Sequence, residues 1–176
     1  MSAWIFSLLV LLAPPERLAA LPAFPGWRET VEQRTTRYRS IAEDIAVTTG
    51  DPRELAVLVA VAYHESGFAP DVDKGPCYRG PRQDRARCDG GRAASMWQIQ
   101  AAGDDDAADL FAHRRVAAAR ALKAIRRSAR TCVQKHGREA ALRVYASGTC
   151  SAGIAESTAM VQLALRLLRD RPPPRG

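Results

Sequence analysis

Residues 59–70, which read VAVAYHESGFAP, contain the side chain of this 176-residue chain best suited to acid–base chemistry. An apolar, helix-compatible run ends in one acidic residue, Glu65, and Ser66 and Gly67 then stop the helix. A carboxyl group at the end of a buried helix has a raised pKa, because burial disfavours its charged form, and a general acid needs such a pKa. The alternative is an ordinary solvated glutamate at a helix end.

The helix that positions Glu65 is predicted to begin at Pro52, after Asp51 as its cap, with Glu54 placed to reach back to that cap. Apolar residues then lie on nearly every side, which is typical of a buried helix. No strand-like alternation appears, so a mainly helical domain is predicted. Further helices are expected from Trp27 to Thr48, from the aspartates 104–106 to about Arg130, from about Arg138 through Tyr145, and from about Ala155 to Arg169.

A second segment with binding chemistry is 93–100, which reads AASMWQIQ. Trp97 offers a stacking surface and Gln98 offers both a donor and an acceptor, a combination used to bind sugars and bases. The alternative is a core tryptophan beside a structural glutamine.

Residues 71–92 are rich in Gly, Pro, Asp and Arg and hold almost no aliphatic residue, which predicts a long surface loop. Asp73, Asp84 and Asp89 in this loop could line a groove next to Glu65, or could serve solubility alone.

Four cysteines occur without a CxxC or Cys/His metal spacing, which favours disulfides over zinc. Their spacing suggests the pairs Cys77–Cys88 and Cys132–Cys150, out of three possible pairings. Two bridges imply an oxidising compartment, and the alternative is four free thiols in a cytosolic protein.

The N-terminal region suggests export. Residues 3–13, AWIFSLLVLLA, form an uncharged apolar run too short to cross a bilayer and of the length of a signal-peptide core. The alternative is an N-terminal core segment. The expected organisation is a signal peptide or short anchor over 1–20 with a candidate cleavage site at Ala19-Ala20, a linker over 21–26, one domain over 27–170 and a flexible tail over 171–176.

Charge is distributed unevenly along the chain. Residues 1–110 carry 12 Lys and Arg against 16 Asp and Glu, whereas residues 111–176 carry 14 against 3. The basic half could hold a polyanion such as nucleic acid, anionic lipid or cell-wall polymer, although solvated helix faces have the same pattern. A nucleic-acid reading motif and interleaved aromatic residues are both missing, which argues against a specific nucleic-acid binder.

Three segments, taken in order, resemble the lytic transglycosylase family (SLT type) of lysozyme-like domains. HESGF at 64–68 matches the family's ESGF segment, whose glutamate is the catalytic acid. ASMWQI at 94–99 resembles the family's GLMQI segment, and VYASG at 144–148 resembles the AYNAG segment that closes the substrate groove. Ser95 stands where the family has Gly, and Ala146 where it has Asn. The resemblance spans 41–168.

The resemblance implies a lysozyme-like helical domain with a long disulfide-closed loop near the active-site groove. It also implies non-hydrolytic cleavage of the β-1,4 bond between N-acetylmuramic acid and N-acetylglucosamine, which leaves 1,6-anhydromuramic ends. Glu65 would be the single acid/base, with no metal and no cofactor. The residues expected to bind substrate are Ser95, Trp97, Gln98 and Tyr145.

Two other functions for the same groove stay open at this point. One is a lysozyme-type hydrolase that uses a second carboxylate, and the other is a non-catalytic peptidoglycan-binding module, suggested by the altered segment 145–147. The expected protein is an exported monomer of the periplasm, cell envelope or extracellular space. It would act on peptidoglycan glycan strands, either in general wall turnover or for a secretion, pilus or phage-tail assembly. His64 is expected to be structural or solvent-facing, because helix neighbours point about 100° apart.

Overall fold

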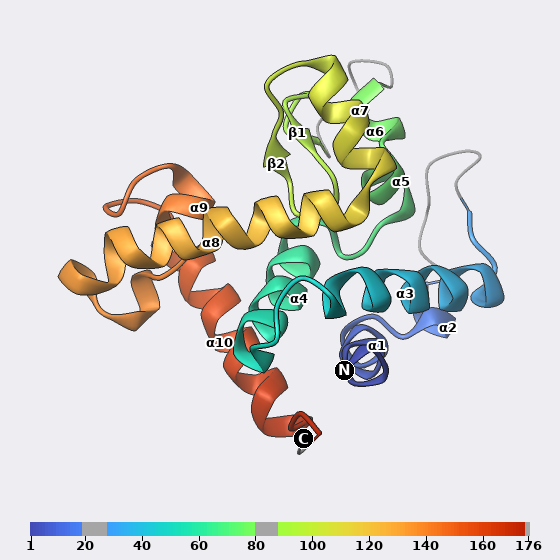
Figure 1. Cartoon of the computed structure of the whole chain (residues 1–176), viewed down its shortest axis with the longest axis horizontal. Coiled ribbons are helices and arrows are strands. Elements are labelled where there is room, and N and C mark those ends of the chain that lie inside the picture. The colour runs from blue at the N-terminus through green and yellow to red at the C-terminus, as the bar shows by residue number, and fades with distance from the viewer. Residues whose placement is uncertain (19–27, 80–87, 175–176) are drawn as a thin grey trace.

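The computed structural model describes residues 1–18, 28–79 and 88–174, and this part of the chain is mainly helical, as predicted. One hydrophobic core runs through it from the first helix to the last. Helix α4 (Pro52–Ser66) lies at its centre, between α3 (Val31–Ala46), α8 (Arg114–His136) and α10 (Ile154–Asp170) (Figure 1).

Helix α4 begins and ends where the sequence predicts. The Asp51 carboxylate accepts a hydrogen bond from the backbone N–H of Arg53 at 2.8 Å, and Gly67 ends the helix with φ +57°. Glu54 does not reach back to the cap. Its carboxylate instead accepts from the Thr49 hydroxyl at 2.6 Å and from Arg126 of α8 at 2.7 Å, so it ties two helices together.

The N-terminal apolar run forms helix α1 (Ser2–Leu12), followed by the short α2 (Pro15–Leu18). Side chains of α1 are fully buried against α3 and α4, and the Trp4 indole donates to the carbonyl oxygen of Arg171 at 2.7 Å. This packing fits the alternative of an N-terminal core segment, and the signal peptide or short anchor over 1–20 stays a prediction. The candidate cleavage site Ala19-Ala20, the linker 21–26 and Trp27 lie outside the described residues. No described helix is long and apolar enough to span a membrane.

The long surface loop predicted over 71–92 is only partly a loop. Two short helices, α5 (Pro70–Lys74) and α6 (Pro76–Arg79), occupy its first part, and Val72 and Tyr78 are buried there. The carboxylates of Asp71 and Asp73 are also buried. The prediction failed because it weighed aliphatic content alone, whereas ion pairs can bury charged residues.

A two-stranded antiparallel sheet was not predicted. Strand β1 (Ala93–Ala94) pairs with β2 (Ile99–Gln100), with Ala93 opposite Gln100 and Ala94 opposite Ile99. Each strand has two residues, which is too short to show an alternating pattern.

The single helix predicted from the aspartates to about Arg130 is two helices, α7 (Asp104–Ala112) and α8, which meet at His113. Asp106 in the first turn of α7 accepts from the backbone N–H of Ala102 at 2.8 Å and pairs with Arg120 at 2.7 Å. The aspartates thus lie at a helix start, as predicted. A 3₁₀ turn, η2 (Arg138–Ala140), then leads to the short α9 (Arg143–Ser147).

Candidate active site

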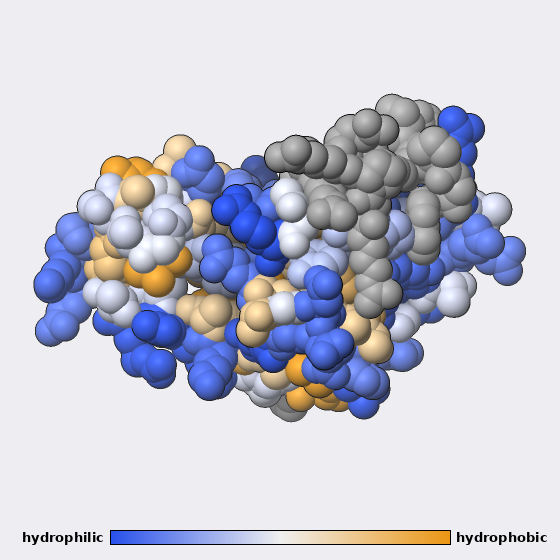
Figure 2. Space-filling model, turned by 90° about the horizontal axis from the view of Figure 1, so that it is seen from above, coloured by the Kyte–Doolittle hydropathy of each residue, from blue (hydrophilic) through white to orange (hydrophobic). Residues whose placement is uncertain are grey.

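The Glu65 carboxyl group lies at the C-terminal end of α4 with 24% of its side chain exposed. It lines a cavity of about 850 Å³ together with Gln98, Tyr145, Asp89 and Arg127, among others. The surface seen from above is hollowed between the part that carries α9 and the middle of the molecule, with hydrophilic side chains along the border (Figure 2). Glu65, Gln98 and Tyr145, three residues predicted from separate segments, therefore share one cavity.

Burial raises the pKa of Glu65 above its ordinary value. The neighbouring His64 opposes this shift, and the carboxylate of Glu156 on α10 adds to it, because a second negative charge disfavours ionisation. A carboxyl group with a raised pKa keeps its proton closer to neutral pH, as a general acid requires.

His64 is exposed, as expected for a solvent-facing residue, but its side chain does not point away from Glu65. Its Nδ1 atom lies 3.7 Å from Oε1 of Glu65, and a third of its side chain is exposed. Adjacent Cβ atoms on a helix point in different directions, but the two flexible side chains at this helix end still turn toward each other.

Residues 95–98 form a tight turn between the two strands. Ser95 and Gln98 adopt positive φ angles of +65° and +49°, and the Gln98 side-chain amide donates to the Ser95 carbonyl oxygen at 3.2 Å. Ser95 thus holds a left-handed backbone conformation that glycine adopts most readily. Ser95 is only 2% exposed, so it shapes the turn, whereas Gln98 lines the cavity.

Trp97 has no exposed surface, and its indole N–H donates to the Leu58 carbonyl oxygen inside α4 at 3.0 Å. The direct substrate contact predicted for Trp97 does not fit this placement. The alternative interpretation, a core tryptophan, fits. By this bond, Trp97 connects the turn that carries Gln98 to the helix that carries Glu65.

Tyr145 closes the cavity from α9. Its hydroxyl donates to the Trp97 carbonyl oxygen, and its backbone N–H donates to the buried Ser128 hydroxyl of α8 at 3.2 Å. Burial, and secondarily the negative charge of Glu65, raise the pKa of Tyr145 well above its ordinary value. Tyr145 thus joins two walls of the cavity as a neutral phenol. Ala146 also lines the cavity.

The main chain after Glu65 is anchored by Arg37 of α3. This guanidinium donates to the Phe68 carbonyl oxygen at 2.9 Å and forms a two-bond ion pair with Glu29 at 2.7 and 2.8 Å. Asp73 lies 3.5 Å from the same guanidinium and pairs with Arg114 at 2.9 Å. Asp73 therefore belongs to a structural ion-pair cluster and does not line the Glu65 cavity.

Asp84 and Asp89 are the other two aspartates that were predicted as candidates to line a groove next to Glu65. Asp84 lies outside the described residues. Asp89 lines the Glu65 cavity, with φ +48° and a 3.0 Å ion pair to Arg92. Among the described residues, no group of three or more His, Cys, Asp or Glu is placed to hold a metal ion.

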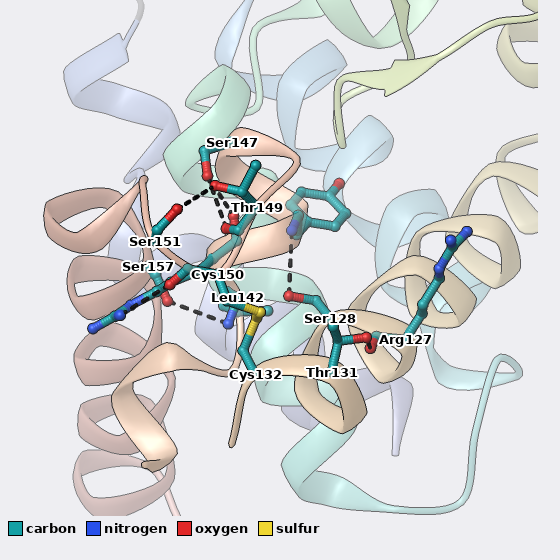
Figure 3. The surroundings of a disulfide bond; sticks show 12 residues. Arg127, Ser128, Thr131, Cys132, Leu142, Ser147, Thr149, Cys150, Ser151 and Ser157 are labelled. Atoms are coloured by element: carbon teal, nitrogen blue, oxygen red, sulfur yellow. Dashed lines mark hydrogen bonds between the residues drawn. A yellow bond between two sulfur atoms is a disulfide. The ribbon is translucent and has the colours of Figure 1, made fainter. Parts of the chain in front are cut away.

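The two disulfides join Cys77 to Cys88 and Cys132 to Cys150, the pairing that the spacing suggested. The second bridge ties the segment after α9 to α8, close to the Ser128–Tyr145 hydrogen bond (Figure 3). The bridge therefore holds the wall of the cavity that carries Tyr145.

A double variant, Cys132→Ala with Cys150→Ala, is expected to lose about 3 kcal/mol of unfolding free energy, because the bridge closes a loop of 18 residues in the unfolded chain. Urea unfolding with and without a reducing agent measures the loss. The variant Cys77→Ala with Cys88→Ala, whose bridge spans 11 residues, is the comparison. A Cys132/Cys150 variant as stable as the oxidised wild type would contradict the structural role.

Arg127 of α8 and Glu156 of α10 were not predicted as site residues. Arg127 lies among many other arginines in the basic C-terminal half, Glu156 is one of its three acids, and no local motif marks either one. Their relation to Glu65 arises only when α8 and α10 pack around α4.

Comparison of the chain with family models, with characterised proteins and with solved structures gave no match.

Proposed function

We propose that this protein cleaves peptidoglycan glycan strands as a lytic transglycosylase of lysozyme-like fold, with Glu65 as its single acid/base. The observation that carries the proposal is one protonatable carboxyl group, its pKa raised by burial, in a cavity of about 850 Å³ that also holds Gln98 and Tyr145. That volume lies in the range of small-molecule sites. The ESGF-, GLMQI- and AYNAG-like segments supply the substrate class.

In the proposed reaction, protonated Glu65 donates its proton to the glycosidic oxygen between N-acetylmuramic acid and N-acetylglucosamine. The bond from that oxygen to the anomeric carbon breaks. The 6-hydroxyl oxygen of the muramic acid then bonds to the anomeric carbon, and its proton passes to the Glu65 carboxylate. The products are a free N-acetylglucosamine hydroxyl and a 1,6-anhydromuramic end, no water is consumed, and no metal or cofactor is needed.

Gln98 and Tyr145 have different parts in this proposal. Gln98 lines the cavity and can donate to or accept from a sugar hydroxyl or acetamido group. The Tyr145 hydroxyl is already bonded to the Trp97 carbonyl oxygen, so Tyr145 offers the sugar its ring and keeps the cavity walls in place.

A lysozyme-type hydrolase is the second candidate, and Asp89 favours it. Inverting and most retaining glycosidases use two carboxylates that flank the scissile bond. Asp89 lines the same cavity as Glu65 and could activate a water molecule, which would give a reducing muramic end.

Product analysis distinguishes the candidates. Purified oxidised protein would be incubated with peptidoglycan, and soluble products analysed by mass spectrometry for wild type, Glu65→Gln and Asp89→Asn. Anhydromuropeptides from wild type and Asp89→Asn, and none from Glu65→Gln, are expected. Reducing-end products that vanish in Asp89→Asn would establish the hydrolase. Retention on sacculi without any product would establish a binding module.

The proposed setting is the periplasm or cell envelope. Two disulfides are typical of an oxidising, exported location. The basic half of the chain matches the anionic charge of the cell wall, whether the protein serves wall turnover or a secretion, pilus or phage-tail assembly.

A further inference from the structure

Four of the six arginines of helix α8 are held by carboxylates of the same molecule. Arg114 pairs with Asp44 and Asp73, Arg115 with Asp44, Arg120 with Asp106, and Arg126 with Glu54, at distances of 2.7 to 2.9 Å. These ion pairs dock α8 against α3, α4, α5 and α7, so they explain why the helix is rich in arginine without any ligand.

Arg127 is different. Within the described part of the chain its guanidinium has no hydrogen-bond or ion-pair partner, and the side chain is exposed. It follows Arg126, which points to Glu54, and successive helical residues point about 100° apart. Figure 3 shows the Arg127 side chain extending away from the Cys132–Cys150 bridge.

The charges around the Glu65 cavity make Arg127 distinctive. Of the described lining residues, Glu65 and Asp89 are the acids and Arg127 is the one cation. A guanidinium group that lines a binding cavity matches a planar carboxylate with two parallel hydrogen bonds. Sugar hydroxyls and acetamido groups carry no charge, and the lactyl carboxyl group of muramic acid is an uncharged amide wherever a peptide is attached, so a peptide-bearing strand offers a carboxylate only through its stem.

We propose that Arg127 is a specificity-determining residue that binds a carboxylate of the peptide stem on the muramic acid. The inference rests on the proposed function, because in peptide-bearing peptidoglycan the free carboxylates next to the glycan are those of the stem. Arg127 then favours strands whose stem peptides keep a free carboxylate over strands whose stem carboxylates are amidated, while Glu65 performs the same chemistry on both.

The test compares two substrates that differ only in charge. Soluble peptidoglycan fragments with free stem carboxylates would be compared with the same fragments after conversion of those carboxylates to primary amides. Arg127→Ala is expected to raise KM about 10- to 100-fold on the free-acid fragments, the usual effect of losing a hydrogen-bonded charge pair, with kcat retained. On the amidated fragments, Arg127→Ala and wild type should have the same KM.

Two variants serve as controls. Arg130→Ala removes a cation from the same helix that lines a different cavity, with Lys123 and Arg126, and it should behave as wild type on both substrates. Arg127→Lys keeps the charge but loses the paired donors. It should therefore show a preference for free-acid over amidated fragments that is weaker than that of the wild type. Equal losses for Arg127→Ala on both substrates, or an equal loss for Arg130→Ala, would overturn the proposal.

A binding measurement separates this proposal from the proposed function. Calorimetric affinities would be measured in the Glu65→Gln background, where no cleavage is expected, for the free-acid and amidated fragments. A preference for the free-acid fragments that disappears in Glu65→Gln with Arg127→Ala supports the role of Arg127 even for a non-catalytic binder. Equal affinities for both fragments would refute it, whether or not the wild type cleaves glycan.

Discussion

Glu65→Gln is expected to lower kcat about 10²- to 10⁴-fold on peptidoglycan, because the amide cannot donate a proton to the leaving oxygen. The measurement is the initial rate of soluble fragment release from purified sacculi. Glu43→Gln, an exposed glutamate on α3, is the matched control and should retain the wild-type rate. Full activity in Glu65→Gln would exclude Glu65 as the acid.

The pH–rate profiles of the wild type and of Glu65→Gln test whether the lost rate is due to the loss of a buried general acid. Because burial raises the pKa of Glu65, the wild-type rate should persist toward neutral pH and fall as pH rises through that pKa. Any residual rate of Glu65→Gln should lack this alkaline fall. A wild-type profile that begins to fall near the ordinary pKa of a glutamate would contradict a buried acid.

Stability should vary with pH in a related way. The folded state favours the protonated form of Glu65. The contribution of this group to the free energy of unfolding is therefore largest at pH values below the pKa that Glu65 has in the unfolded chain. Its contribution is then lost as pH rises through the raised folded pKa. Glu65→Gln has a neutral side chain at every pH and should become more stable than wild type on the alkaline side. Urea unfolding at acidic and mildly alkaline pH measures this crossover.

Trp97→Ala is expected to lower the unfolding free energy by about 3–5 kcal/mol, the usual cost of deleting a buried aromatic side chain. Trp97 has no exposed surface, and its indole bonds to α4, so the change leaves a cavity between α4 and the turn that carries Gln98. Denaturant unfolding followed by circular dichroism measures the loss.

Trp97→Phe separates the core role from a role in stacking on sugar. It keeps an aromatic ring but removes the indole donor to Leu58, so stability should fall by roughly 1 kcal/mol or somewhat more. The KM for glycan should stay at the wild-type value, since Trp97 is not exposed in the cavity. A raised KM with unchanged stability would show that Trp97 contacts substrate after all.

The features predicted correctly from sequence are those that short stretches of chain specify. The pair Asp51 and Pro52 starts α4, and Gly67 ends it through a left-handed conformation that favours glycine. Cysteine spacing suggested both disulfides. The apolar surface of α4 required a buried central helix, and the position of Glu65 at its end followed directly.

Where the sequence-based interpretation failed, the decisive contact was made by a residue from a distant segment. Asp73 and Asp89 look alike in one polar stretch, yet Arg37 and Arg114 hold Asp73 in an ion-pair cluster while Asp89 faces the Glu65 cavity. The apolar N-terminal run suited either a signal peptide or a core helix. The structure adds that α1 packs on α3 and α4, and the signal peptide stays a prediction.

The sequence by itself determined α4 with its two ends, the disulfide pairs and the one acid at the end of that buried helix, because capping, periodicity and loop closure act over short distances. Only the tertiary structure decided what surrounds that acid. Tyr145 and Arg127 lie far from Glu65 along the chain, and they reach its cavity because ion pairs dock α8 beside α4 and a disulfide holds the segment after α9. The chain holds many similar side chains, and no local sequence pattern shows which of them will face the cavity once these helices have packed together.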